Sequence, residues 1–386
     1  MIVGNPPYLE AKLMPETLKQ RIRDTCPIAA SGSFDLYAAF VELSAKLLPA
    51  DGALSFLLPN RILVTRSTLG LRLWLLGLGS VRVADLSESG EFGKAAAVYP
   101  VVFEFRPGVE NDYLVQQLGA TSAFRLSADF VINRLAGTMP LPPKSRAGAA
   151  LFERVLTDDS FGELGALFEV RWSVSFHKGG LRDEYVFPER PDDGVNPQRF
   201  LGGGRFQGNR EVEPYRVSWA GHWIDYDEER ARRDRNSFPP QSIFTERKVV
   251  ICQNARRGRA ALDKNGFILK DTFVCVLPRP GITDNPGWLE WLVLLVNSDF
   301  FHYIYEHLYG GTRKGGGHLH YIKSYLAPFP IALPGDLGEV TRIHAALVAD
   351  PEDLDTKRLA EELVRRSYAV SSDEAVPLDQ YEYPSF

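Results

Sequence analysis

The four residues Asn5, Pro6, Pro7 and Tyr8, directly after the first apolar stretch of the chain, combine groups that could perform chemistry. Each proline fixes its own φ at about −65° and keeps the preceding residue extended, so the carbonyl groups of Asn5 and Pro6 are held rigidly. Tyr8 adds a flat aromatic face beside them. Two fixed acceptors next to an aromatic plate suit an exocyclic aromatic amine, because the acceptors bind its hydrogens while its ring stacks on the tyrosine. The simpler interpretation is a Pro-Pro turn that closes an ordinary strand.

A short strand, Ile2–Val3, must position this turn, and the next hundred residues predict the sheet around it. Apolar residues at helical spacing, Leu36, Phe40, Leu43 and Leu47, predict an amphipathic helix over Phe34–Leu48. Leu13–Arg23 is expected to be a polar helix or a lid, and Leu69–Leu78 a second apolar helix. The expected strands are Ala53–Leu58, Val81–Leu86 and Val98–Phe105. Helices that alternate with buried strands favour an α/β sheet of largely parallel strands.

The tetrapeptide Asn-Pro-Pro-Tyr resembles the catalytic motif of the DNA N6-adenine methyltransferases, which act on an adenine flipped out of the duplex. The resemblance extends, in order and spacing, to the gamma class and to the fused type IIG restriction-modification enzymes, through Asp35–Tyr37, Leu47–Gly52, Phe56–Asn60 and Leu71–Leu75. It implies that the Asn5 side-chain oxygen and the Pro6 carbonyl accept hydrogen bonds from the adenine amine, and that Tyr8 stacks on the base.

Residues Glu91–Phe105 resemble a later motif of the same family, in which an aromatic side chain packs on the flipped base opposite the tyrosine. The resemblance gives that role to Phe92. An equally plain interpretation of Phe92 is a core aromatic residue ahead of a strand.

The resemblance also implies S-adenosylmethionine as the methyl donor. The family binds it with a glycine-rich loop and an acidic residue upstream of Asn-Pro-Pro-Tyr, whereas here the motif begins at residue 5. The glycine clusters Leu76–Ser80 and Phe200–Gly204 lack the strand-loop-helix context of a cofactor loop. We therefore expect an N-terminal segment or a separate subunit to supply the cofactor-binding half, the sheet edge at Ile2–Val3 to be open, and the chain to be inactive alone.

A second region, residues 171–335, is rich in aromatic residues, turns and arginines. Strands are expected at Val249–Gln253, Gly266–Leu269 and Thr272–Leu277, with Asp263–Gly266 as a hairpin turn, and helices at Trp288–Asn297 and Phe300–Leu308. The segments Glu246–Ile251, Leu292–Ser298 and Lys323–Ile331 resemble the TaqI-like specificity domain, which implies that this region reads the DNA sequence beside the target adenine.

The expected DNA-contacting residues are Arg256, Arg257 and Arg259 after the first of these strands, and Arg313, Lys314 and His318 in a glycine-rich loop. Arginine can bind a guanine edge with two hydrogen bonds, although most arginines in such regions contact phosphates or nothing. We assign no metal, because His318 and His320 have no cysteines or carboxylates nearby at ligand spacing.

Composition and charge agree with a DNA enzyme without requiring one. The 386 residues are 45% hydrophobic and carry a formal charge of −5, but residues 171–334 carry +4 and the remainder −9. A solvated protein face would give the same asymmetry. Neither a signal peptide nor a membrane-spanning apolar run is apparent, so we expect a cytoplasmic protein, and its cysteines, Cys26, Cys252 and Cys275, should be reduced and mostly buried.

The predicted fold is α/β, a partial Rossmann-like methyltransferase sheet followed by a mixed α+β target-recognition domain. The expected parts are a catalytic half at 1–106, a bridge at 107–170, the recognition domain at 171–335, and a tail at 336–386 with helices at Leu337–Leu347 and Asp355–Tyr368. The predicted function is site-specific adenine methylation within a restriction-modification enzyme, without a nuclease constellation in this chain. The alternatives are a DNA-binding specificity module without catalysis, and methylation of another amine such as a glutamine side chain.

Overall fold

The computed structural model describes residues 1–86, 99–117, 123–177, 182–204, 210–281, 287–313 and 317–381. The chain divides into two compact units. The first unit comprises Met1–Arg154, Tyr305–Gly317 and Asp379–Phe386, and the second comprises Val155–Ile304 and His318–Leu378. A short stretch late in the sequence, Tyr305–Gly317, therefore returns to the first unit.

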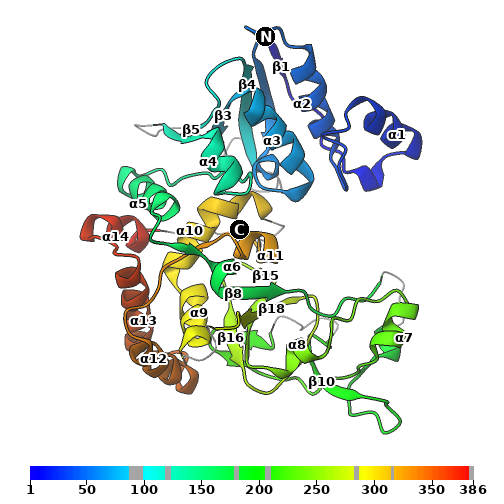
Figure 1. Ribbon diagram of the computed structural model, residues 1–386, viewed down its shortest axis with the longest axis vertical. Coiled ribbons are helices and arrows are strands. Elements are labelled where there is room, and N and C mark those ends of the chain that lie inside the picture. The colour runs from blue at the N-terminus through cyan, green and yellow to red at the C-terminus, as the bar shows by residue number, and fades with distance from the viewer. Residues whose placement is uncertain are drawn as a thin grey trace. The chain divides into compact units, whose positions relative to one another are not determined.

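The first unit is built on one six-stranded sheet, drawn in blue to cyan in Figure 1, with helices along it. Its strands are β1 (Ile2–Gly4), β2 (Leu54–Pro59), β3 (Gly79–Asp85), β4 (Pro100–Pro107), β5 (Asp112–Gln117) and β6 (Phe124–Ser127). Its α-helices are α1 (Glu16–Thr25), α2 (Leu36–Leu47), α3 (Leu69–Leu78), α4 (Ala128–Asn133) and α5 (Arg146–Thr157), the last of which ends in the second unit. Its 3₁₀ turns are η1 (Ala11–Leu13), η2 (Asn60–Leu63), η3 (Arg66–Thr68) and η5 (Gly310–Thr312).

The strand order is β1-β2-β4-β3-β5-β6, and the sheet is mixed. Only β1 with β2 and β3 with β5 are parallel; β4 runs antiparallel to both of its neighbours, and β6 runs antiparallel to β5. The α/β class is confirmed, but the expectation of largely parallel strands is wrong, because an apolar run marks a buried strand without fixing its direction. Strands β5 and β6 lie in the stretch expected to be a bridge, and they extend the same sheet.

Helix α2 forms where the spacing predicts it, but its apolar stripe does not face the core. The side chains of Phe40, Leu43 and Leu47 are 42%, 46% and 69% exposed, whereas Tyr37 and Val41 are buried. The helix therefore presents an apolar face to its surroundings in addition to the face that packs on the sheet.

The second unit distributes shorter strands among five sheets in the described part of the chain. Its strands are β7 (Gly162–Glu163), β8 (Phe168–Arg171), β9 (Val186–Phe187), β10 (Pro197–Leu201), β11 (Val212–Glu213), β12 (Arg216–Val217), β13 (Trp223–Asp225), β14 (Lys248–Cys252), β15 (Asn254–Ala255), β16 (Ala260–Asp263), β17 (Ile268–Leu269), β18 (Phe273–Pro278), β19 (Leu319–His320) and β20 (Pro330–Ile331). The order β16-β14-β18-β8 forms the largest buried sheet, and α9 (Trp288–Asn297) lies against β16 and β14 (Figure 1).

The sequence predicts the three longest of the remaining helices. The remaining helices are α6 (Leu164–Leu167), η4 (Arg182–Glu184), α7 (Glu228–Arg233), α8 (Ser242–Thr245), α10 (Asp299–Tyr309), α11 (Lys323–Leu326), α12 (Leu337–Ala349), α13 (Leu354–Ser367) and α14 (Ser372–Asp379). Helix α10 begins among residues of the second unit and ends among residues of the first. The apolar helices expected at Trp288–Asn297 and Phe300–Leu308 are confirmed, as are the two tail helices α12 and α13.

A buried ion pair fixes the turn that follows β16. Lys248 Nζ lies 2.5 Å from Asp263 Oδ2, and both side chains are fully buried. Asp263 also accepts hydrogen bonds from the backbone amides of Asn265 and Phe267, and Gly266 has a φ of +70°, as an Asn-Gly turn allows. The turn is therefore confirmed, but the hairpin is wrong, because β17 leaves this sheet and pairs in parallel with β10.

All three cysteines, Cys26, Cys252 and Cys275, are free and buried, as expected from the sequence. Burial raises the pKa of the Cys252 thiol to about 11 and that of Cys275 to about 12. Over the described residues, every helix is too short or too polar to cross a membrane.

Candidate active site

The Asn5–Tyr8 turn leaves the sheet at the end of β1 and continues alongside β2. The two strands are in parallel register, with Gly4 opposite Phe56, and the ring of Phe56 fills the space beside the Gly4 Cα. Pro6 is buried, whereas Asn5 is exposed. The turn is thus held by one proline and leaves the amide of Asn5 accessible.

Tyr8 is fixed as a partly exposed plate at the end of this turn. Its hydroxyl donates to the Leu57 carbonyl of β2 at 3.0 Å, and the ring meets Tyr37 of α2 edge to face, with centroids 6.1 Å apart and an angle of 87°. The side chain nevertheless remains 40% exposed, and partial burial raises the pKa of its phenol. A neutral, immobilised ring with an open face is suited to stacking.

The Asp35–Tyr37 segment is tied to the residues that follow the turn. The Leu36 amide donates to the Leu9 carbonyl at 2.9 Å, and the Ala11 amide donates to the Phe34 carbonyl at 2.8 Å. The buried Asp35 carboxylate lies 3.6 Å from Arg61, but burial outweighs the guanidinium and raises the pKa of Asp35. Three of the motif segments, around residues 5–8, 35–37 and 57–60, therefore meet in one place.

A buried arginine, Arg72 of α3, holds the turn that follows β2 through hydrogen bonds. Its guanidinium donates to the Ile62 carbonyl at 2.7 Å, to the Thr65 carbonyl at 2.9 Å and to the Thr68 hydroxyl at 2.7 Å. Sequence reasoning included Arg72 in a motif but gave it no role. An arginine within an otherwise apolar helix was the available signal.

The residues expected in the glycine-rich loop are separated by the fold. Arg313 belongs to the first unit, and its guanidinium pairs with the buried carboxylate of Glu306 and lies 5.7 Å from the ring centroid of Tyr99. His318 belongs to the second unit, where it precedes β19. Lys314 and the expected stacking residue Phe92 lie outside the described residues.

The three arginines after β14 have different surroundings. Arg256 follows the ribbon of β15 and β19, and the register Ala255 opposite Leu319 brings Arg256 and His318 to the same end of it. Arg256 and Arg257 are both exposed, and Arg257 pairs with Asp299.

Arg257 and Arg259 also line a cavity of about 530 Å³ in the second unit. Its other charged lining residues are Glu213, Asp299, Glu352, Lys357 and Glu361. The carboxylates make this cavity a poor phosphate site.

The two glycine clusters differ in the space beside their glycines. A carbon added to Gly79 would lie 2.0 Å from the Arg106 carbonyl oxygen, and one added to Gly203 would lie 2.4 Å from His222 Cβ, whereas no atom lies within 4 Å of one added to Gly77. The cluster Leu76–Ser80 spans the end of α3 and the start of β3, which is the order helix-strand and not the strand-loop-helix order of a cofactor loop. The close approaches leave little room for a bound cofactor at Gly79 and Gly203.

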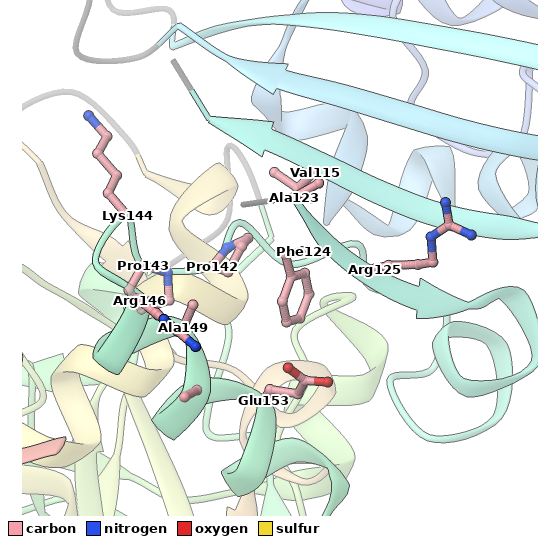
Figure 2. Close-up of a pocket in the computed structure, with 11 residues that line it drawn as sticks. Val115, Ala123, Phe124, Arg125, Pro142, Pro143, Lys144, Arg146, Ala149 and Glu153 are labelled. Atoms are coloured by element: carbon pink, nitrogen blue, oxygen red, sulfur yellow. The ribbon is translucent and has the colours of Figure 1, made fainter. Parts of the chain in front are cut away.

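A second cavity, of about 330 Å³, lies in the first unit between β6 and α5 (Figure 2). Figure 2 shows Phe124 near its centre, while the charged ends of Lys144 and Arg125 point away from each other. Arg125 pairs with Asp112 at 3.2 Å. Because its cations do not converge, this cavity lacks the arrangement of an anion site.

Comparison with known proteins matches both regions. Residues 1–84 match the Eco57I restriction-modification methylase family, and residues 206–331 match the TaqI-like C-terminal specificity domain. Both matched regions of the chain are therefore similar to parts of restriction-modification enzymes. These matches confirm the resemblance that the sequence motifs indicate.

Individual proteins resemble this chain over different lengths. The type II methyltransferase M.TthHB8I of Thermus thermophilus is 27% identical over 315 residues, which cover 78% of this chain and 65% of that protein. M.BstVI of Geobacillus stearothermophilus is 28% identical over 103 residues, covering 26% of this chain and 18% of that protein. The chain therefore spans somewhat less than two thirds of the length of M.TthHB8I.

A solved structure has a fold similar to that of this chain. The type IIL restriction-modification enzyme MmeI, solved in complex with DNA, superimposes with a TM-score of 0.53 at 12% identity, covering 99% of this chain and 56% of that one. The likeness confirms the fold class, an α/β sheet region followed by a mixed α+β region.

Proposed function

We propose that the chain carries the target-base site and the specificity region of a DNA adenine methyltransferase of a restriction-modification system. The observation that carries the proposal is the Asn5–Tyr8 turn: an exposed amide and an anchored aromatic plate stand together at a strand end. In the overall reaction the adenine N6 nitrogen would form a bond to the methyl carbon of S-adenosylmethionine as the bond from that carbon to sulfur breaks, leaving S-adenosylhomocysteine and releasing one amine proton.

In this proposal each residue of the turn acts on the flipped adenine. The Asn5 side-chain oxygen and the Pro6 carbonyl accept hydrogen bonds from the amine and hold its nitrogen toward the methyl donor, while Pro7 keeps the turn rigid. Tyr8 stacks on one face of the base, and Phe92 is proposed for the other. Orientation and hydrogen bonding supply the rate, without a covalent enzyme intermediate.

We further propose that another polypeptide segment, on an N-terminal extension or a separate subunit, binds the cofactor and covers the open side of the first unit. Among the described strands β1 has one neighbour, β2, and its Val3 side chain is 66% exposed. The apolar stripe of Phe40, Leu43 and Leu47 on α2 is also open. An unpaired strand edge and an apolar helix face suit an added strand and helix.

Recognition of the DNA sequence is proposed for the region 171–335. Arg256 and His318, at one end of the β15–β19 ribbon, are the preferred contacts, and Lys314 joins them in the proposal. Arg257, Arg259 and Arg313 are also proposed to contact DNA. Their side chains have contacts within the protein that would restrict how far they extend toward DNA. The location proposed for this enzyme is the cytoplasm, where DNA is accessible to it.

The test measures tritium transfer from S-adenosyl-[methyl-³H]methionine to duplex DNA, followed by digestion and chromatography of the nucleosides. The chain is assayed alone and together with the segment that supplies the cofactor site. Label in N6-methyladenine only in the combined assay supports the proposal. Sequence-specific DNA binding without transfer of tritium to DNA would instead favour a specificity module without catalysis. Transfer of tritium to a glutamine side chain of a protein would favour the alternative in which the enzyme methylates an amine other than adenine N6.

Equilibrium dialysis of S-adenosylmethionine against the chain tests separately whether another polypeptide segment supplies the cofactor site. We expect no saturable binding to the chain alone and saturable binding after the second segment is added. Saturable binding to the chain alone would contradict the proposed division.

A further inference from the structure

The 3₁₀ turn η5, which follows α10, lies directly against the turn that follows β2. A carbon added to Gly311 would lie 2.7 Å from the Asn60 carbonyl oxygen and 2.8 Å from Val64 Cγ2. Both distances are shorter than ordinary van der Waals contact. Gly311 is therefore a position where one backbone approaches another so closely that a side chain cannot fit.

The same two turns are joined a second time, through side chains. Arg313, one residue after η5, pairs with Glu306 of α10 and lies over the ring of Tyr99. The Tyr99 carbonyl in turn accepts a hydrogen bond of 2.7 Å from the Asn60 amide. Contacts thus run from Asn60 to Gly311, along the chain to Arg313, across to Tyr99 and back to Asn60.

This closed set of contacts lies close in sequence to the anchor of the stacking tyrosine. Asn60 is three residues beyond Leu57, whose carbonyl accepts the Tyr8 hydroxyl. Arg72 holds the residues after Asn60 from the other side. A shift of Asn60 would therefore be taken up by the end of β2, because the rest of the turn is fixed.

We propose that the segment Gly311–Arg313 is a positioning element for the target-base site: it fixes the Asn60 end of β2 and, through Leu57, the Tyr8 plate. The inference rests on the function proposed above. It gives a positioning role to residues that, from their glycine-rich sequence, were expected to contact DNA. Precise placement matters because a small displacement of a stacked base changes the angle at which its amine reaches the methyl donor.

The chain offers a matched pair of variants for the test. Gly311→Ala places a carbon against Asn60, whereas Gly310→Ala places one where no atom lies within 4 Å. We expect Gly311→Ala to lower kcat for methyl transfer by at least about tenfold, while the Kd for duplex DNA stays within about twofold. Gly310→Ala should leave both within about twofold. Equal effects of the two alanines on kcat, or a Gly311→Ala effect confined to DNA affinity, would overturn the proposal.

Arg313→Lys tests the side-chain connection between Arg313 and Tyr99. It also provides a test of the proposal if Gly311→Ala does not fold. Lysine keeps the charge beside Glu306 but loses the planar face over Tyr99. We expect a smaller decrease in kcat, about threefold, with unchanged DNA affinity. A kcat equal to that of the unaltered protein would count against the role of Arg313.

Hydrogen exchange of the chain alone separates this inference from the proposed enzyme activity. In Gly311→Ala or Arg313→Lys, the amides of residues 56–64 and 5–9 should exchange faster than in Gly310→Ala. This result would support the positioning role even if no methyl transfer were found, whereas a change confined to residues near 311–313 would overturn it.

Discussion

The two units hold their candidate functional residues in different ways. In the first unit, the Asn5–Tyr8 turn projects from a single six-stranded sheet, and hydrogen bonds to β2 and contacts with α2 fix it. In the second unit, fourteen short strands within the described residues are divided among five sheets, and Arg256 and His318 stand at the end of a two-stranded ribbon. The difference agrees with the proposed roles: a reaction needs one fixed geometry, whereas binding residues are commonly carried at the ends of short elements and on loops.

The largest expected effect separates chemistry from DNA binding. Asn5→Ala should lower methyl transfer by at least about 100-fold, because the amine loses a preorganised acceptor, and leave DNA affinity within about twofold. Asn133→Ala, an exposed asparagine of the same unit, is the matched control and should change neither. Parallel loss of DNA binding in Asn5→Ala would contradict the division between the units.

The next largest effect concerns the frame of the second unit. Lys248→Met should destabilise the fold by about 3–5 kcal/mol in urea unfolding, because it leaves the fully buried Asp263 carboxylate without its partner. The double variant Lys248→Met/Asp263→Asn should recover part of this loss. A loss below about 1 kcal/mol in the single variant would show that the ion pair does not hold the turn after β16.

A third prediction concerns the pH dependence of stability. Burial lowers the pKa of His344 in α12 to about 4. As the pH falls below about 6.5 the unfolded state takes up a proton, while the folded state does not until about pH 4, so stability decreases across this range by roughly 3 kcal/mol from this group. His344→Leu should reduce the difference in unfolding free energy between pH 7.5 and pH 4.5 by about that amount. An unchanged difference would show that His344 is not protected from protonation.

The smallest effect distinguishes two adjacent arginines. Arg256→Ala should weaken DNA binding about tenfold and reduce its salt dependence, as expected for loss of one contact. Arg257→Ala, whose guanidinium pairs with Asp299, should change DNA affinity less than about twofold and stability by less than about 1 kcal/mol. A larger loss of DNA affinity in Arg257→Ala than in Arg256→Ala would indicate that the cavity, and not the β15–β19 ribbon, contacts DNA.

The sequence predicted the elements of the first unit well where local signals were strong. The run Leu54–Leu58 and the helix Leu69–Leu78 have compositions that determine their local structure. Strand direction did not follow from the sequence, because the position of β4 between β2 and β3 depends on pairing with distant residues. The turn at Gly266 was predicted from its Asn-Gly sequence, but the partner of the next strand was not.

The candidate site was predicted only where a motif is contiguous. Asn5–Tyr8 could be identified as a unit because its chemistry lies in four adjacent residues. The role of Gly311 could not, because a glycine that admits a neighbouring backbone has the same sequence signature as one in an open loop. The stretch Tyr305–Gly317 returns to the first unit across 150 intervening residues, and no local pattern encodes such a return.

The burial of Cys26, Cys252 and Cys275 makes the chain a convenient starting point for labelling. Thiol reagents attack the thiolate, which burial both hides and disfavours at Cys252 and Cys275. A cysteine introduced at an exposed position such as Val195, which is 82% exposed, would then react while the native thiols stay silent. A fluorophore could then be attached at this single position of the second unit without any native cysteine being removed.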